Sequence, residues 1–187
     1  SHWAKHKPDH SFLVWEPKSG ATRTWTYAEF EREVANVAAG LAARGVVKGD
    51  KILIHAENCP EAVLTWYACA RLGAVGVTTN TRSAGAEIEY FADHTRCVGG
   101  VTQPQFAKVV KENAKKLRFL VVTDDNSGEA ASADEKSHGL ESFSALRGDG
   151  AALAPRTPDP MAPAGIMFTS GTTSRPINLP VWPDALP

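Results

Sequence analysis

The sequence predicts an α/β protein whose sheet is doubly wound, mostly parallel and flanked by helices. Two observations carry this prediction. Short apolar segments alternate with longer amphipathic ones along most of the chain, which is the order that arises when crossover helices join parallel strands. The 187 residues are 43% hydrophobic, so the chain can bury a core of domain size.

The chain is expected to open with a hairpin followed by a helix. Residues 11–15 and 22–25 have the composition of short strands joined by a turn rich in glycine and proline. Thr26 and Glu29 then form a capping-box pattern, in which each side chain accepts a hydrogen bond from the other residue's backbone N–H. The helix that this box begins places apolar residues at helical spacing and should end at Gly45.

The middle of the chain continues the alternation of strands and helices. We expect strands at residues 51–56, 75–79, 97–102 and 119–123, and helices between them at about 59–73, 83–93 and 106–117. Asn58 can cap the first of these helices, and Pro60 is tolerated in the first turn. Aromatic residues on the apolar helix faces, such as Trp66, are interpreted as core and not as part of a binding site.

The remainder of the chain is richer in polar residues, proline and glycine. Residues 124–138 are expected to form a surface loop, and residues 140–146 a short helix. The segment after that helix carries four prolines and should be extended. We therefore divide the chain into an α/β subdomain, a Pro/Ala/Gly-rich loop, a strand with a phosphate loop, and an unassigned tail, at residues 1–147, 148–164, 165–176 and 177–187.

Composition excludes several classes of protein. The 20 basic and 21 acidic residues nearly cancel, so the chain carries no electrostatic footprint for nucleic acid. No apolar run approaches the roughly 20 residues of a membrane span, and none resembles a signal peptide. Three cysteines without metal-ligand spacing favour reduced thiols in the cytoplasm, and no metal site is expected. The sequence leaves a homodimer open.

The segment from Ile166 to Pro176 is the most informative motif. An apolar run that can form a buried strand is followed by small residues with hydroxyl groups around one glycine: Thr169, Ser170, Gly171, Thr172 and Thr173. Such a turn can present several backbone N–H groups and hydroxyls to one anion. We expect it at a strand end on a solvent-accessible edge. The alternative is an ordinary Ser/Thr/Gly turn without a ligand.

The match from Phe168 to Pro176 resembles the phosphate-loop signature of the adenylate-forming (ANL) superfamily, which includes acyl-CoA synthetases. Ser174 stands where that signature usually has glycine, and Ile177 where it has lysine. Upstream segments resemble successive landmarks of an acyl-CoA ligase: 45–51, 57–61, 71–75 and 80–82. The resemblance covers residues 11–176 and is greatest to the crotonobetaine/carnitine–CoA ligase branch.

This resemblance implies the amino-terminal subdomain of an ATP-dependent acyl-CoA ligase. In that family a carboxylic acid and ATP form an acyl-adenylate and pyrophosphate, and coenzyme A then gives the thioester, with Mg²⁺ as the metal. Residues 169–173 would hold the β- and γ-phosphates. The family's catalytic lysine, magnesium ligand and adenine contacts lie downstream of the phosphate loop, so we expect a fragment without catalytic residues of its own.

Two other functions stay open at this point. One is a degenerate module that binds a nucleotide or a partner and catalyses nothing, which the isoleucine at position 177 favours. The other is an adenylation domain that loads a carrier protein instead of coenzyme A. The identity of the carboxylic acid cannot be deduced from this sequence, although the resemblance implies an enzyme of fatty-acid or related acyl metabolism.

Overall fold

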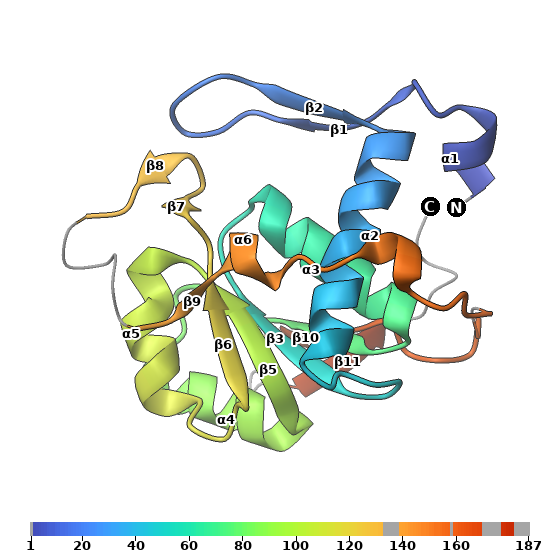
Figure 1. Cartoon of the computed structure of the whole chain (residues 1–187). Helices are drawn as coiled ribbons and strands as arrows, with labels where there is room; N and C mark the ends of the chain where they lie inside the picture. Colours follow the sequence, from blue (N-terminus) through green and yellow to red (C-terminus); the bar gives the residue numbers. More distant parts are fainter. Residues whose placement is uncertain (1, 133–138, 158, 170–176, 182–187) are drawn as a thin grey trace.

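A mostly parallel sheet forms the centre of the computed structural model, which describes residues 2–132, 139–157, 159–169 and 177–181. Among these residues seven strands lie in the order β11–β10–β4–β3–β5–β6–β9 (Figure 1). In that order they span Ile177–Val181, Gly165–Thr169, Val75–Thr78, Lys51–His55, Cys97–Thr102, Phe119–Val122 and Glu141–Ser142. Only the β10–β11 pair is antiparallel. The predicted fold class is therefore confirmed.

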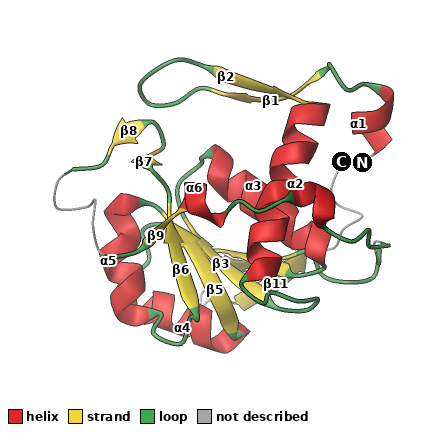
Figure 2. Ribbon diagram, in the orientation of Figure 1, coloured by secondary structure: helices red, strands yellow, loops and turns green. Residues whose placement is uncertain are grey.

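Helices cover both faces of this sheet (Figure 2). One core cluster joins Ile52 of β3 to α2 (Tyr27–Ala43) and α3 (Pro60–Leu72). A second joins Leu53, the next residue of β3, to α4 (Gly85–Thr95) and α5 (Pro104–Asn113). Successive side chains of a strand point to opposite faces, so β3 supplies both cores and is buried along most of its length.

The amino-terminal elements pack on the α2 side of the molecule. They are α1 (His2–His6) and the antiparallel pair β1 (Ser11–Trp15) and β2 (Arg23–Thr26). Trp25 of β2 is buried in the same core as α2. The predicted capping box is confirmed, with 3.2 Å from the Glu29 N–H nitrogen to Thr26 Oγ1 and 2.9 Å from the Thr26 N–H nitrogen to Glu29 Oε2. Within the described part of the chain, no helix has the length and apolar character needed to cross a membrane.

Two predictions about where helices begin were wrong. The N-cap of α3 is Cys59 and not Asn58, and the Cys59 side chain makes no capping bond. Residues 141–142 are strand β9, parallel to β6, and only Phe143–Leu146 form the helix α6. A two-residue strand is defined by its partner and not by its own periodicity, which explains why the second error arose.

The predicted surface loop after β6 is partly buried. It contains the short hairpin β7 (Asp125–Asn126) and β8 (Glu129–Ala130). Asn126 and the next residue, Ser127, are both buried. Asn126 Oδ1 accepts a hydrogen bond from the backbone N–H of Gln105 at 3.0 Å. The polar side chains that favoured a solvated loop thus bind to the start of α5 instead.

The end of α6 and the segment after it pack closely on α2. Their backbone approaches the helix so nearly that a Cβ atom at Gly40 would lie 1.3 Å from the Leu146 carbonyl oxygen. The N–H of Gly148 donates to the Asn36 carbonyl oxygen at 2.8 Å, and the N–H of Gly150 donates to Asn36 Oδ1 at 3.2 Å. A short 3₁₀ helix, Gly150–Ala152, follows. The prediction of extended structure from residue 148 onward was therefore wrong for these first residues.

We expect Gly40→Ala to lower the free energy of unfolding by about 1–3 kcal/mol, because the new methyl group must displace the backbone at Leu146. Helix propensity alone would give the opposite sign, a gain of up to about 1 kcal/mol. Urea unfolding followed by circular dichroism measures the difference. Arg32→Ala, at an exposed position of the same helix, should change stability by less than about 0.5 kcal/mol. A stabilised Gly40→Ala variant would contradict the close contact.

Candidate functional site at the carboxyl ends of β3, β4 and β10

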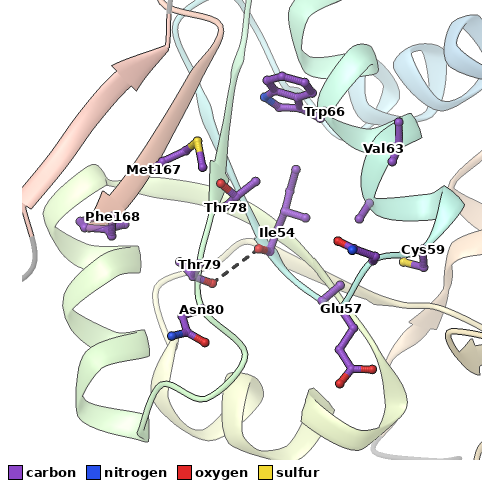
Figure 3. A pocket seen from close by; sticks show the side chains of 13 residues that line it. Ile54, Glu57, Cys59, Val63, Trp66, Thr78, Thr79, Asn80, Met167 and Phe168 are labelled. Carbon is purple, nitrogen blue, oxygen red and sulfur yellow. Dashed lines mark hydrogen bonds between the residues drawn. The ribbon is translucent and has the colours of Figure 1, made fainter. Parts of the chain in front are cut away.

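A hollow of about 420 Å³ lies at the carboxyl ends of three adjacent strands (Figure 3). These strands are β3, β4 and β10, which pair in parallel. Ligands of open α/β sheets bind at this edge, where the strand ends and following loops meet. The lining residues are Ile54, Ala56, Glu57, Asn58, Cys59, Ala62, Val63, Trp66, Thr78, Thr79, Asn80, Met167 and Phe168.

One wall of the hollow is the indole of Trp66. Gly76 of β4 and Gly165 of β10 are directly paired across the two strands. A Cβ atom at Gly76 would lie 2.5 Å from Trp66 Cδ1, and one at Gly165 would lie 2.9 Å from Trp66 Nε1. The paired glycines therefore make room for the ring against the sheet. Met167, whose side chain is 53% exposed, lines the hollow from β10.

The rim of the hollow is polar and almost uncharged. Glu57 is the one charged residue among the described residues that line it. Its carboxylate lies 2.7 Å from Lys18 Nζ, and this hydrogen bond lowers the pKa of Glu57 below its ordinary value. Asn80 Oδ1 accepts a hydrogen bond from the backbone N–H of Arg82 at 2.9 Å. Neutral hydroxyl and amide groups thus dominate the mouth of the hollow.

Cys59 is a neutral part of the lining. Its side chain is buried, and burial raises the pKa of the thiol to about 12. A thiolate is the nucleophilic form of cysteine, so this residue acts here as a small apolar side chain. Cys69 and Cys97 are also free and buried.

A buried histidine lies beside the rim. His55, the last residue of β3, is 1% exposed, and its Nδ1 lies 2.8 Å from Thr79 Oγ1. In the described part of the chain its Nε2 has no hydrogen-bond partner. Burial lowers the pKa of His55 from 6.5 to about 4. The imidazole is therefore neutral at physiological pH and links β3 to the loop that follows β4.

The predicted phosphate loop begins at the edge of this hollow. Thr169 is the last residue of β10, directly after Phe168, which lines the hollow. The pairing of Met167 with Thr78 brings the end of β10 beside the end of β4. The other predicted residues, Ser170, Gly171, Thr172 and Thr173, lie outside the described residues, so the phosphate site stays a prediction. Residues 177–181, assigned no structure from sequence, form β11.

The chain belongs to the family of AMP-binding enzymes, whose sequence profile matches residues 1–176. This agrees with the resemblance found from the motif and with the fold. Two solved structures share the fold. The anthranilate CoA ligase AuaEII in complex with anthranoyl-AMP has a TM-score of 0.76 and 21% identity over 95% of this chain and 33% of that chain. The apo structure of Mycobacterium smegmatis MbtA has a TM-score of 0.74 and 27% identity, and the match covers 96% of this chain and 32% of that chain.

Curated relatives of similar sequence are crotonobetaine/carnitine–CoA ligases. The protein from Shigella flexneri serotype 5b is 33% identical over 171 residues, which is 88% of this chain and 32% of the relative. The protein from Escherichia coli strain SE11 is 32% identical over 170 residues, with the same coverage. The chain thus spans about a third of the length of the curated relatives it matches.

Sequence reasoning identified part of this site and missed the rest. Glu57, Asn58 and Asn80 belong to the landmark segments, and the structure brings all three to one rim. Trp66 was interpreted as core, whereas its ring packs on the sheet and also lines the hollow. His55 is not among the residues that the sequence predicts for the site. A histidine that ends an otherwise apolar predicted strand is the signal that could have found it, since strand ends carry the sites of such folds.

Acidification should destabilise the protein through His55. The pKa is lower in the folded than in the unfolded state, so below pH 6.5 the unfolded state binds the extra proton. Stability is lost as pH falls through 6.5 towards 4, by about 2–3 kcal/mol between about pH 7 and about pH 4.5. Urea unfolding of the wild type and of His55→Asn at both pH values isolates this contribution. Equal pH dependence in the two proteins would contradict it.

Proposed function

We propose that this chain is the ATP-phosphate-binding part of an ATP-dependent acyl-CoA ligase. The observation that carries the proposal is the position of the motif from Phe168 to Pro176. It begins at a hollow at the carboxyl ends of three parallel strands, in a chain of the AMP-binding enzyme family. A turn rich in backbone N–H groups and hydroxyls suits a phosphate ligand at such an edge.

The proposed reaction has two steps. A substrate carboxylate attacks the α-phosphorus of ATP, and the bond to pyrophosphate breaks, leaving an acyl-adenylate. The thiol of coenzyme A then attacks the acyl carbon and displaces AMP, which gives the thioester. Thr169 to Thr173 would bind the β- and γ-phosphates during the first step. Phosphoryl-group chemistry of this kind depends mainly on positioning and charge stabilisation, and Mg²⁺ would supply part of the charge.

The names of the relatives support a small carboxylic acid and coenzyme A as substrates. The chain spans only about a third of the curated relatives, so the particular acid is left open. The proposal also includes the remaining expectations from sequence. These are a cytoplasmic location, a role in fatty-acid metabolism and a homodimer.

A second candidate is a module that binds a nucleotide without catalysis. Ile177 stands at the position where the family signature has lysine, and the backbone of this residue pairs with Thr169 at the start of β11. A lysine at that position would add positive charge beside bound phosphates. Its absence favours binding without turnover, and the activity experiment below distinguishes the two candidates.

We expect the isolated 187-residue chain to catalyse no carboxylate-dependent exchange of pyrophosphate into ATP, because the resemblance implies that the family's catalytic lysine, magnesium ligand and adenine contacts lie downstream of the phosphate loop. The product of any longer reading frame that contains this sequence should catalyse the exchange and then consume coenzyme A. In that protein, Thr172→Ala should slow exchange by about 10- to 100-fold, since a hydrogen bond to a charged oxygen contributes about 1.5–3 kcal/mol.

Thr22→Ala, at an exposed position of the β1–β2 turn, is the matched control and should leave exchange unchanged. Robust exchange by the 187-residue chain would contradict the expectation that the catalytic groups lie downstream of the phosphate loop. A longer protein that binds ATP but exchanges no pyrophosphate with any carboxylate would favour the binding module. Transfer to a carrier protein in place of coenzyme A would indicate the carrier-loading alternative.

A further inference from the structure

Four segments that are distant in sequence join in a closed ring of hydrogen bonds at the rim of the hollow. Lys18 Nζ donates to Glu57 Oε2 at 2.7 Å, and the Glu57 backbone N–H donates to Gln103 Oε1 at 2.9 Å. Gln103 Nε2 donates to Ser127 Oγ at 2.7 Å. The Lys18 backbone N–H donates to the Ser127 carbonyl oxygen at 3.0 Å and closes the ring. We call these four residues the Glu57 clasp.

The interior part of the clasp is built from buried polar groups. Gln103 is 0% exposed and Ser127 is 3% exposed. Buried amides and hydroxyls are costly unless they are hydrogen-bonded, and here the two side chains bind each other. Ser127 has a φ of 59°, a left-handed conformation that residues other than glycine seldom adopt. The two-residue turn between Asn126 and Glu129 of the β7–β8 hairpin requires this conformation, since Gly128 also has a positive φ, of 94°. The hairpin turn thus fixes Ser127 where its hydroxyl and carbonyl groups meet Gln103 and Lys18.

The clasp holds Glu57 at two points. Gln103 binds its backbone N–H and Lys18 binds its carboxylate, which also accepts a hydrogen bond from the Gln105 side chain. Figure 3 shows this carboxylate extending away from Trp66 and Val63, which line the hollow. A free carboxylate at the mouth would repel an anionic ligand, whereas a paired one at this position does so weakly.

We propose that Lys18, Gln103 and Ser127 are positioning residues for the hollow: they hold the Glu57 carboxylate paired and turned away from Trp66, so that the mouth accepts the phosphates of a nucleotide. None of these three residues belongs to the phosphate-loop signature. The inference rests on the proposed function, because it takes ATP as the ligand. Its two parts, the position of Glu57 and the effect on an anion, are measured separately.

The first measurement is the affinity for ATP of the wild type, Lys18→Met and the double variant Lys18→Met/Glu57→Gln. Lys18→Met should weaken ATP binding by about three- to tenfold at about 0.05 M salt, and the difference should nearly vanish at about 0.5 M salt, where charges are screened. Lys18 Nζ also lies 3.5 Å from Glu129 Oε2, a carboxylate that does not line the hollow. The double variant should regain most of the wild-type affinity, because it neutralises the carboxylate that does line the hollow and leaves only Glu129 without Lys18. Lys108→Met, on the exposed side of α5, controls for the loss of one positive charge and should have no effect.

The second measurement is amide hydrogen exchange at Glu57. Gln103→Met removes the acceptor of this N–H and should speed its exchange by about tenfold or more, with no comparable change at Val101 in the centre of the sheet. Ser127→Ala should have a smaller effect of the same kind, and it serves alone if Gln103→Met does not fold. Lys108→Met, at an exposed position of α5, is the control and should leave the Glu57 amide protected.

Unchanged exchange at Glu57 in both variants would overturn the positioning role. A double variant that binds ATP as weakly as Lys18→Met would overturn the electrostatic role, since the Lys18 effect would then not depend on Glu57. Absence of ATP binding in the wild type would contradict the proposed phosphate site. It would also contradict the inferred effect of the Glu57 carboxylate on an anionic ligand. The exchange rates at Glu57 would still decide whether the clasp positions the rim.

Discussion

The parallel pairing of β10 with β4 is the contact on which the arrangement of this protein depends. It joins two segments about ninety residues apart in the sequence, in the register Gly165 to Gly76, Ile166 to Val77 and Met167 to Thr78. On one face, Ile166 and Phe168 then pack against the core of α4 and α5. On the other face, the paired glycines receive Trp66 and leave Met167 beside the hollow. Without this pairing Met167 and Phe168 would not meet the lining residues that β3, α3 and β4 supply.

Polar groups near the strand ends are arranged so that few of them are left without partners. Thr102 Oγ1 donates to the His55 carbonyl oxygen at 2.8 Å, and Thr79 Oγ1 lies within hydrogen-bond distance of His55 Nδ1. Gln103 and Ser127 bind each other a few residues further on. Partly satisfied networks are unfavourable in a dry interior, so the loops at this edge are held in defined positions while the walls of the hollow remain apolar. A rigid rim of this kind is suited to orienting a charged ligand.

Periodicity and capping patterns predicted the main strands and helices because those elements are specified locally. The continuous buried run of β3 and the Thr26–Glu29 box are examples. The errors fall where structure depends on distant partners. Strand β9 exists because β6 lies beside it, and the polar residues Asn126 and Ser127 are buried because α5 and Gln103 bind them. The landmark residues of the rim were found by resemblance, whereas Lys18 and Gln103 are recognisable only once the four segments are seen together.

The paired glycines behind Trp66 also affect how the size of such a site could change among related proteins. Neither residue lines the hollow, yet each limits how closely the indole can approach the sheet. A methyl group at either position would push the ring outward and reduce the space in front of it, without changing any group that meets a ligand. Related proteins could therefore alter the size of the molecule they accept through substitutions on the strands themselves, which a comparison restricted to ligand-contacting residues would overlook.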